Sequence, residues 1–164
     1  MTATATATTP AEEKRNRYRD TLQQLTGVLP AARDEVAVMA SAACLLRDAL
    51  PAASWVGFYR VVAPGLLRVG PYQGPLGCLE IPFDKGVCGA AAREETTQLV
   101  PDVDAFPGHI ACDTTARSEI VVPVRNRDGA VIAVLDVDSR QLAAFDEIDR
   151  EGLEAVAREL APHL

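Results

Sequence analysis

The sequence has no apolar run long enough to cross a lipid bilayer, which takes about 20 consecutive, mostly apolar residues. Its most apolar helical stretch, residues 36–50, is amphipathic and contains Arg47 and Asp48. The first ten residues, MTATATATTP, lack the basic start and the apolar centre of a signal peptide. We therefore expect a cytoplasmic protein with a disordered leader over residues 1–10.

Clusters of basic residues are also missing. The 16 Lys and Arg residues are scattered among 23 Asp and Glu residues, which gives a net charge of −7 at pH 7. Nucleic-acid binding depends on grouped Lys and Arg side chains that contact phosphates, so this composition argues against it. With 164 residues, the chain is long enough for one domain with a hydrophobic core and short for two.

Paired cysteines are the third absence. The four cysteines are far apart, with no CxxC pair, and no His-x-x-x-His spacing accompanies them. A permanent disulfide framework is disfavoured in a reducing compartment, and a zinc site is disfavoured by the spacing, so we expect no bound metal. Two uses remain for the thiols, as inert core side chains or in redox chemistry.

Helical periodicity alternates with strand periodicity along the chain. Apolar spacing predicts helices, and period-two runs rich in β-branched residues predict strands. The predicted helices are residues 10–25, 33–50, 86–95 and 145–164, and the predicted strands are residues 54–62, 66–74, 77–83 and 97–103. Residues 118–139 predict a hairpin that turns at Asp128-Gly129. Strands joined mostly by hairpins indicate an α+β fold around an antiparallel sheet, with a single domain over residues 11–164.

Three acidic residues belong to the predicted hairpin. Asp136 and Asp138 end its second strand and, being two residues apart, share one face, while Glu119 opens the first strand. The turn position brings these strand ends together, so the three carboxyl groups are expected at one edge of the sheet. Mutual repulsion and burial would raise their pKa values and allow one to deliver a proton to a substrate. The alternative is ordinary: Asp138 ends a strand and Glu119 lies in solvent.

The cysteines occupy different sequence environments. Cys112 lies in a polar loop shortly before Glu119, and Cys78 opens a predicted strand. Cys88 lies near the start of a predicted helix, where the helix dipole would lower the pKa of its thiol. Cys44 falls on the apolar stripe of residues 33–50, which we interpret as core. Each thiol could equally be an inert small apolar side chain.

Three further side chains have two interpretations each. His109 is either a base for the Cys112 thiol or, as we favour, a loop histidine bonded to nearby backbone. Trp55 and Tyr59 share one face of a strand, and they form either core or one wall of a pocket. Core is the default for aromatic residues.

Several sequence blocks resemble one known family, the free methionine-(R)-sulfoxide reductases, which are single GAF-domain enzymes. The blocks are SWVGFYR, GPYQG, IPFDKGVCGAAA, TQLVPDVDAFPGHIACD, SEIVVPV and VLDVDS. They span about residues 11–160, and the run from VPDV through HIACD to SEIVVP is the most specific part. The resemblance implies a GAF fold with a six-stranded antiparallel sheet flanked by helices, usually as a homodimer.

The resemblance also implies a reaction and a site. A cysteine attacks the sulfur of free methionine-(R)-sulfoxide and becomes a sulfenic acid, which a second cysteine converts to a disulfide that thioredoxin reduces. No cofactor is needed. Residue by residue, the nucleophile falls on Cys112 and the resolving cysteine on Cys78, with Cys88 as the third family cysteine. The acidic substrate contacts fall on Glu119, Asp136 and Asp138, and the aromatic wall falls on Trp55 beside Tyr59.

Helix position makes Cys88 the most acidic thiol whereas the family pattern selects Cys112, and we follow the family for the nucleophile. Either Cys78 or Cys88 could resolve the sulfenic acid, and this question stays open. A GAF domain that senses a small molecule or the redox state without catalysis is the alternative function. Tyr72 stands where the family often has Phe, and Cys44 lies outside the family pattern.

Overall fold

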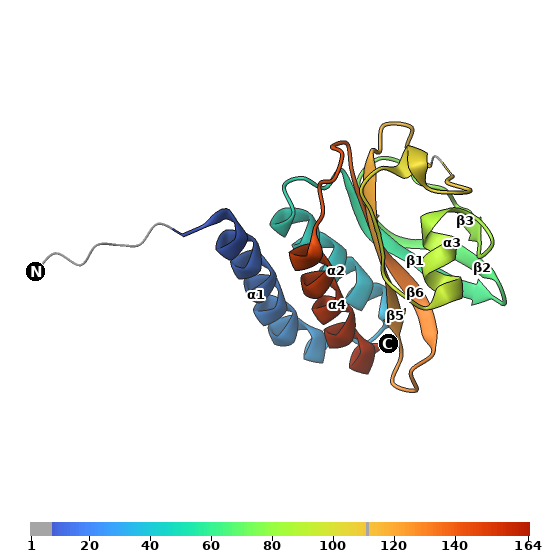
Figure 1. The fold of residues 1–164 in the computed structure, drawn as a ribbon. Coiled ribbons are helices and arrows are strands. Elements are labelled where there is room, and N and C mark those ends of the chain that lie inside the picture. Colours follow the sequence, from blue (N-terminus) through green and yellow to red (C-terminus); the bar gives the residue numbers. More distant parts are fainter. Residues whose placement is uncertain (1–7, 111) are drawn as a thin grey trace, which may run out of the picture.

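A computed structural model describes residues 8–110 and 112–164. Six strands form one antiparallel sheet in the order β3-β2-β1-β6-β5-β4 (Figure 1). The strands are β1 (Trp55–Ala63), β2 (Leu66–Gln73), β3 (Glu80–Pro82), β4 (Gln98–Val100), β5 (Ser118–Arg125) and β6 (Val131–Ser139). The predicted α+β fold with a six-stranded antiparallel sheet is confirmed.

Four α-helices cover the sheet unequally. They are α1 (Pro10–Val28), α2 (Glu35–Ala49), α3 (Gly86–Glu94) and α4 (Glu147–Leu160), and short 3-10 turns occupy Leu29–Ala31, Val103–Ala105 and Ala161–His163. Helices α1, α2 and α4 lie on one side of the sheet, and α3 lies on the other (Figure 1). The sheet is therefore buried on both faces by helices, but the α3 side has only one short helix and leaves room for loops.

Strand alternation divides the buried residues into two clusters. On β1, Val56 and Phe58 belong to the core with α1, α2 and α4, whereas Trp55 and Tyr59 belong to the core with α3. The hairpin β5–β6 follows the same rule, because successive side chains of a strand point to opposite faces. Val134 and Val121 lie in the cluster on the α3 side, so the even positions of β6 and the odd positions of β5 face α3.

Helix α1 is fixed at its start by local capping and by a long-range ion pair. Thr9 before the helix and Glu12 in its first turn form a capping box, so the helix begins at Pro10, inside the region expected to be a disordered leader. Of that leader, residues 1–7 lie outside the described residues. Further along α1, Lys14 and Tyr18 bond the buried carboxylate of Asp149 on α4. A charged contact thus joins the two ends of the chain.

The prediction that Cys44 lies in the core is wrong, because Cys44 is exposed. The buried face of α2 consists of Val38, Met39, Ala42, Ala43 and Leu46. One residue advances a helix by about 100°, so Cys44 turns away from the sheet beside Ala43. Val36, an apolar residue near the start of the same helix, is also exposed. The spacing of apolar residues predicted the helix correctly, but the buried face of the helix is rotated relative to the predicted apolar stripe.

Element boundaries differ from the sequence prediction by a few residues. Helix α1 continues past Gly27 to Val28 and tightens into a 3-10 turn that contains Pro30. Cys78 does not open a strand, since β3 starts only at Glu80. The cysteine therefore lies in the loop between β2 and β3, where its position is set by the loop and not by strand pairing.

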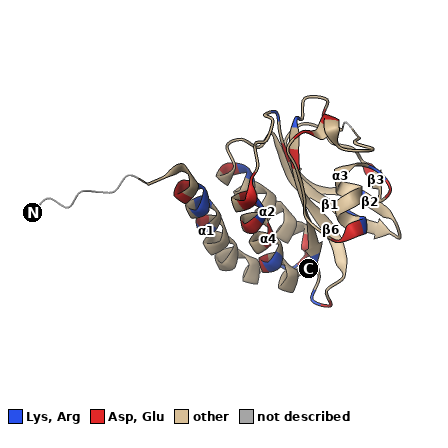
Figure 2. Cartoon of the chain, viewed as in Figure 1, with Lys and Arg blue, Asp and Glu red and all other residues tan. Residues whose placement is uncertain are grey.

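Charged residues lie mostly on the helices and in the loops, whereas long stretches of the strands have none (Figure 2). Within the described part of the chain, no helix is both long enough and apolar enough to cross a membrane. The second finding agrees with the sequence, in which no apolar run is long enough to cross a bilayer.

Candidate active site

The hairpin register brings the three predicted acids together. Glu119 on β5 pairs directly with Asp138 on β6, and Asp136 pairs with Val121. The three acidic side chains extend to the α3 side of the sheet and line one cavity there. Glu119 and Asp136 are almost fully buried. The prediction that these carboxyl groups gather at one edge is confirmed, and the solvent-exposed alternative for Glu119 is wrong.

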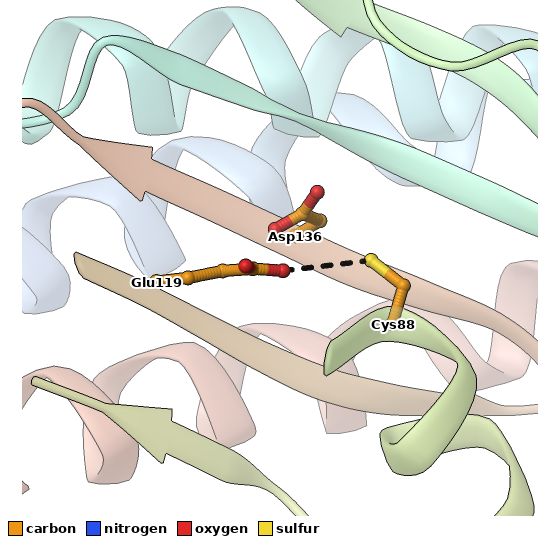
Figure 3. Close-up of side chains that lie close together, drawn as sticks. All are labelled: Cys88, Glu119 and Asp136. Atoms are coloured by element: carbon orange, nitrogen blue, oxygen red, sulfur yellow. Dashed lines mark hydrogen bonds between the residues drawn. The ribbon is translucent and has the colours of Figure 1, made fainter. Parts of the chain in front are cut away.

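Cys88 on α3 joins this acid cluster (Figure 3). Its Sγ lies 3.8 Å from Oε1 of Glu119, with the thiol donating the hydrogen bond. Atoms of Cys88, Glu119 and Asp136 that could ligate a metal all lie within 4.8 Å of one another. Asp136 Oδ1 is buried and has no hydrogen-bond partner among the described residues. A buried acceptor without a donor is costly, so this oxygen is suited to a ligand that carries N–H or O–H groups.

Burial raises the pKa values of all three acids above their ordinary range. For Glu119 burial is the main cause, and repulsion from Asp136 and Asp138 adds to it. For Asp138 burial comes first and repulsion from Asp136 second. Burial raises the pKa of Asp136 to about 7, against the lowering effect of hydrogen bonds from Cys88 and Glu119. Protons are therefore held in this cluster near neutral pH, as the sequence predicted.

The expectation of a low pKa for Cys88 is wrong. Cys88 lies in the first turn of α3, as predicted, but burial raises the pKa of its thiol well above the ordinary value, and the charges of Asp136 and Glu119 raise it further. Desolvation next to carboxylates opposes thiolate formation more strongly than a nine-residue helix can favour it. Cys88 is a neutral hydrogen-bond donor in this site.

The same donor set could contact a cation. One soft sulfur and two hard carboxylate oxygens form a mixed donor set, which suits a borderline divalent metal ion. Each of the three groups has a raised pKa, however. A metal ion would therefore have to displace protons from them, which makes any such binding strongly pH-dependent.

A disulfide lies beside the acid cluster. Cys78, in the β2–β3 loop, is bonded to Cys112, with their Cα atoms 5.1 Å apart. Cys112 lines the cavity that contains the acids, whereas Cys78 is not among its lining residues. The two remaining cysteines, Cys44 and Cys88, are free. The chain can thus store two electrons in one cysteine pair beside the acid cluster.

The cavity itself is small while this disulfide is present. Its volume is about 30 Å³, which is room for one or two water molecules. His109 lines it, and its backbone N–H donates to the Phe106 carbonyl oxygen over 3.2 Å. This bond belongs to the main chain and does not involve the imidazole ring, so both interpretations of the His109 side chain stay predictions.

Asp113 is a cavity residue that the sequence analysis did not select. Its Oδ1 accepts hydrogen bonds from the backbone N–H and the hydroxyl of Thr115, which lower the pKa of this carboxyl. The other oxygen, Oδ2, is buried and has no partner among the described residues. Asp113 also raises the pKa of Asp138 by repulsion. The Asp-x-Thr turn directly after Cys112 was the available signal, because such turns fix a carboxylate in place.

An aromatic stack backs the cavity. Trp55 lies between Tyr59 and Tyr72, with ring centroids 5.6 Å and 5.1 Å apart and nearly parallel planes. Gly57 makes this possible, because a Cβ at this position would lie 2.7 Å from the Trp55 ring and 2.2 Å from Tyr72 Cβ. Tyr59 lines the cavity and Trp55 does not. Both interpretations therefore hold in part, with Trp55 buried in the core and Tyr59 in the wall.

The GAF domain family matches residues 31–164. Among curated proteins, the free methionine-R-sulfoxide reductase of Escherichia coli is 36% identical over 145 residues, which are 87% of this chain and 86% of that protein. The chain belongs to the free methionine-R-sulfoxide reductase family. A family structure from Neisseria meningitidis, solved in complex with its substrate, is 44% identical with a TM-score of 0.86 and covers 98% of this chain and 94% of its own. A second structure, of the Staphylococcus aureus protein fRMsr in complex with substrate, is 38% identical with a TM-score of 0.82. The match covers 95% of this chain and 97% of that chain. The predicted family is confirmed.

Proposed function

We propose that this protein reduces free methionine-(R)-sulfoxide to methionine with its own thiols. The observation that supports this most directly is the Cys78–Cys112 disulfide, one sulfur of which belongs to a residue that lines a cavity with protonatable acids. A sensor that only binds a ligand has no use for a cysteine pair at its binding site. Relatives whose names state this activity match nearly the whole chain.

In the proposed chemistry, Cys112 acts as the nucleophile. Its sulfur attacks the sulfoxide sulfur, methionine leaves, and the oxygen stays on Cys112 as a sulfenic acid. The thiol of Cys78 then attacks Cys112 Sγ, forms the disulfide and releases the oxygen as water. Two thiols are oxidised and one sulfoxide is reduced. No other group is required to balance the reaction, so the proposal includes no cofactor.

The acid cluster has two tasks in this proposal. Protonation of the sulfoxide oxygen makes the sulfoxide sulfur a better target for the Cys112 sulfur, so one protonated acid among Glu119, Asp136 and Asp138 donates a proton to it. The remaining carboxylates bind the substrate's ammonium group, which supplies the N–H donors that Asp136 Oδ1 lacks. A free amino acid carries this ammonium group, whereas a peptide bond at the same place would remove its charge.

The aromatic residues are proposed to bind the methyl end of the substrate. Tyr59 supplies the cavity wall, and Trp55 supports it by stacking. Thioredoxin is the proposed reductant of the disulfide, and the protein is proposed to act as a cytoplasmic homodimer. Titration with thioredoxin tests the reductant, and light scattering of the purified protein tests the homodimer.

The deciding experiment uses fully reduced protein and no added reductant. The protein is given pure R or pure S free methionine sulfoxide, and both methionine and remaining thiols are counted. We expect about one methionine per protein from the R epimer, together with the Cys78–Cys112 disulfide by peptide mapping. If neither epimer yields methionine and the thiols stay intact, the protein is not this reductase.

A further inference from the structure

The loop between β2 and β3 displays two leucines beside the disulfide. Leu76 and Leu79 are 84% and 74% exposed, which makes them the most exposed large apolar residues in the described part of the chain. They stand two residues before and one residue after Cys78. A single exposed leucine is ordinary in a folded protein. Two such side chains on either side of a redox-active sulfur form an apolar contact surface around it.

The backbone of this loop is anchored on the sheet. Trp55 Nε1 donates a hydrogen bond to the Pro75 carbonyl oxygen over 3.1 Å, and the Val69 N–H donates to the Leu79 carbonyl oxygen over 3.0 Å. At Gly77 the chain approaches so closely that a Cβ would lie 2.8 Å from the Tyr59 hydroxyl. Since the inward side of the loop is occupied by its own backbone contacts, the two leucines are held facing outward.

The two sulfurs of the disulfide differ in their surroundings. Cys112 faces the cavity with the acid cluster, and Cys78 lies outside the cavity lining in the loop that carries the leucines. Thiolate attack on a disulfide depends on access to one sulfur and on departure of the other. Attack on Cys78 needs no entry into the cavity, and it releases Cys112 toward carboxyl groups that hold protons near neutral pH.

The charge of the loop also suits a partner. Residues 73–79 contain no charged side chain, in a protein with a net charge of −7. An attacking thiolate is itself an anion, and it meets no carboxylate on this segment. A partner whose reactive thiol is surrounded by apolar surface can bury Leu76 and Leu79 without leaving a charge unpaired.

From these observations we propose that residues 74–79 are the docking surface for a small dithiol reductase of the thioredoxin type. Leu76 and Leu79 are its apolar contacts, and Cys78 Sγ is the atom attacked. This inference rests on the proposed function. The partner's thiolate forms a mixed disulfide with Cys78, the Cys78–Cys112 bond breaks, and Cys112 leaves with the electron pair and takes up a proton. The partner's second thiol then releases Cys78 as a thiol, so the partner becomes the disulfide.

The first test is steady-state turnover with a bacterial thioredoxin and its reductase, compared with turnover driven by dithiothreitol. Removing two buried apolar side chains from a protein interface lowers the affinity at least about tenfold. The double variant Leu76→Ser/Leu79→Ser should therefore lower kcat/KM for thioredoxin about tenfold or more, while dithiothreitol-driven turnover stays unchanged. The control is Val28→Ser, an exposed apolar residue on α1, which should change neither value. Unchanged kcat/KM for thioredoxin in the double variant would overturn the docking surface.

The second test traps the intermediate. Oxidised protein is mixed with thioredoxin whose second active-site cysteine is serine, the mixture is quenched in acid, and the linked peptides are mapped. We expect thioredoxin on Cys78, and a link to Cys112 would overturn the assignment. Methionine yield from pre-reduced protein, measured without any reductase, reports on the proposed function alone. A normal yield with a failed docking test would therefore reject only the docking surface.

Discussion

The thiol of Cys88 donates a hydrogen bond to Oε1 of Glu119 across 3.8 Å, while the other two family cysteines, Cys78 and Cys112, are bonded to each other. This arrangement separates the roles of the three thiols. Cys88 belongs to the acid cluster as a buried donor, and its raised pKa keeps it out of nucleophilic chemistry near neutral pH.

We expect Cys88→Ala to retain the first turnover. The variant should still form about one methionine per protein and the Cys78–Cys112 disulfide. Losing one hydrogen bond, at about 1 kcal/mol, should lower kcat/KM about fivefold. Because the thiol hydrogen bond lowers the pKa of Glu119, the variant should also shift the pH profile upward. Cys44→Ala, at an exposed thiol, is the control. Absence of the disulfide in Cys88→Ala would assign Cys88 a resolving role instead.

Glu119→Gln and Asp138→Asn should each lower turnover by roughly two orders of magnitude or more, which is the usual contribution of general acid catalysis. Both substitutions keep the side-chain shape and remove the proton that the raised pKa retains. Single-turnover methionine formation with the R epimer measures the effect before any disulfide is reduced. Arg125 lies on the same strand as Glu119 but is only partly buried and is paired with Glu95 outside the cavity, so Arg125→Gln serves as the control. Near-normal rates in both acid variants would show that the cluster donates no proton.

The acid cluster should also make the protein less stable as the pH rises. The pKa of Asp136 is raised from 3.8 to about 7 by folding, so between these values the folded protein binds more protons than the unfolded chain. The free energy of unfolding therefore falls as the pH rises from about 4 to about 7. Asp136→Asn should remove part of this dependence and exceed the parent in stability above pH 7 by about 1 kcal/mol or more. Urea unfolding of both proteins at pH 5 and pH 8 measures the difference, and parallel pH curves would contradict it.

Much of the site followed from strand periodicity and turn position. Two-residue spacing placed Asp136 and Asp138 on one face, and the Asp128-Gly129 turn determined that Glu119 pairs at their level. These are local geometric rules that a single sequence expresses. They predicted the acid cluster without knowledge of the packing around it.

Burial by distant segments could not be predicted in the same way. The helix position of Cys88 suggested an acidic thiol, but the side chain lies against acids from β5 and β6, which are distant in sequence, and desolvation dominates. The prediction for Cys44 was wrong for a related reason, because several rotations of α2 give an apolar stripe and only contacts with the sheet select one. Asp113 was missed because its importance comes from a loop that folds back over the cavity.

Tyr18→Phe should destabilise the fold and leave catalysis unchanged. The Tyr18 hydroxyl donates to Asp149 Oδ1 over 2.9 Å in a buried setting, and a hydrogen bond to a charged group contributes about 1.5–3 kcal/mol. Unfolding in urea measures this loss. The control is Thr26→Ala, which removes an exposed bond between the same two helices, from Thr26 to Glu159. We expect Thr26→Ala to lower the free energy of unfolding by less than about 1 kcal/mol. Equal losses in both variants would mean that burial does not strengthen the Tyr18–Asp149 hydrogen bond.

Methionine, the product, should bind the reduced protein far better than the disulfide form. With the Cys78–Cys112 bond closed, the cavity offers about 30 Å³, which holds one or two waters and is too small for an amino acid. Breaking the bond frees the loop that carries Cys112 from the loop that carries Cys78, so the cavity can widen. Calorimetry with oxidised protein and with Cys78→Ser, which cannot form the bond, should differ in methionine affinity by about tenfold or more, or at least 1.4 kcal/mol. Cys44→Ser, oxidised in the same way, should behave like the oxidised parent. Equal affinities for the oxidised parent and Cys78→Ser would mean that the disulfide does not control access to the acid cluster.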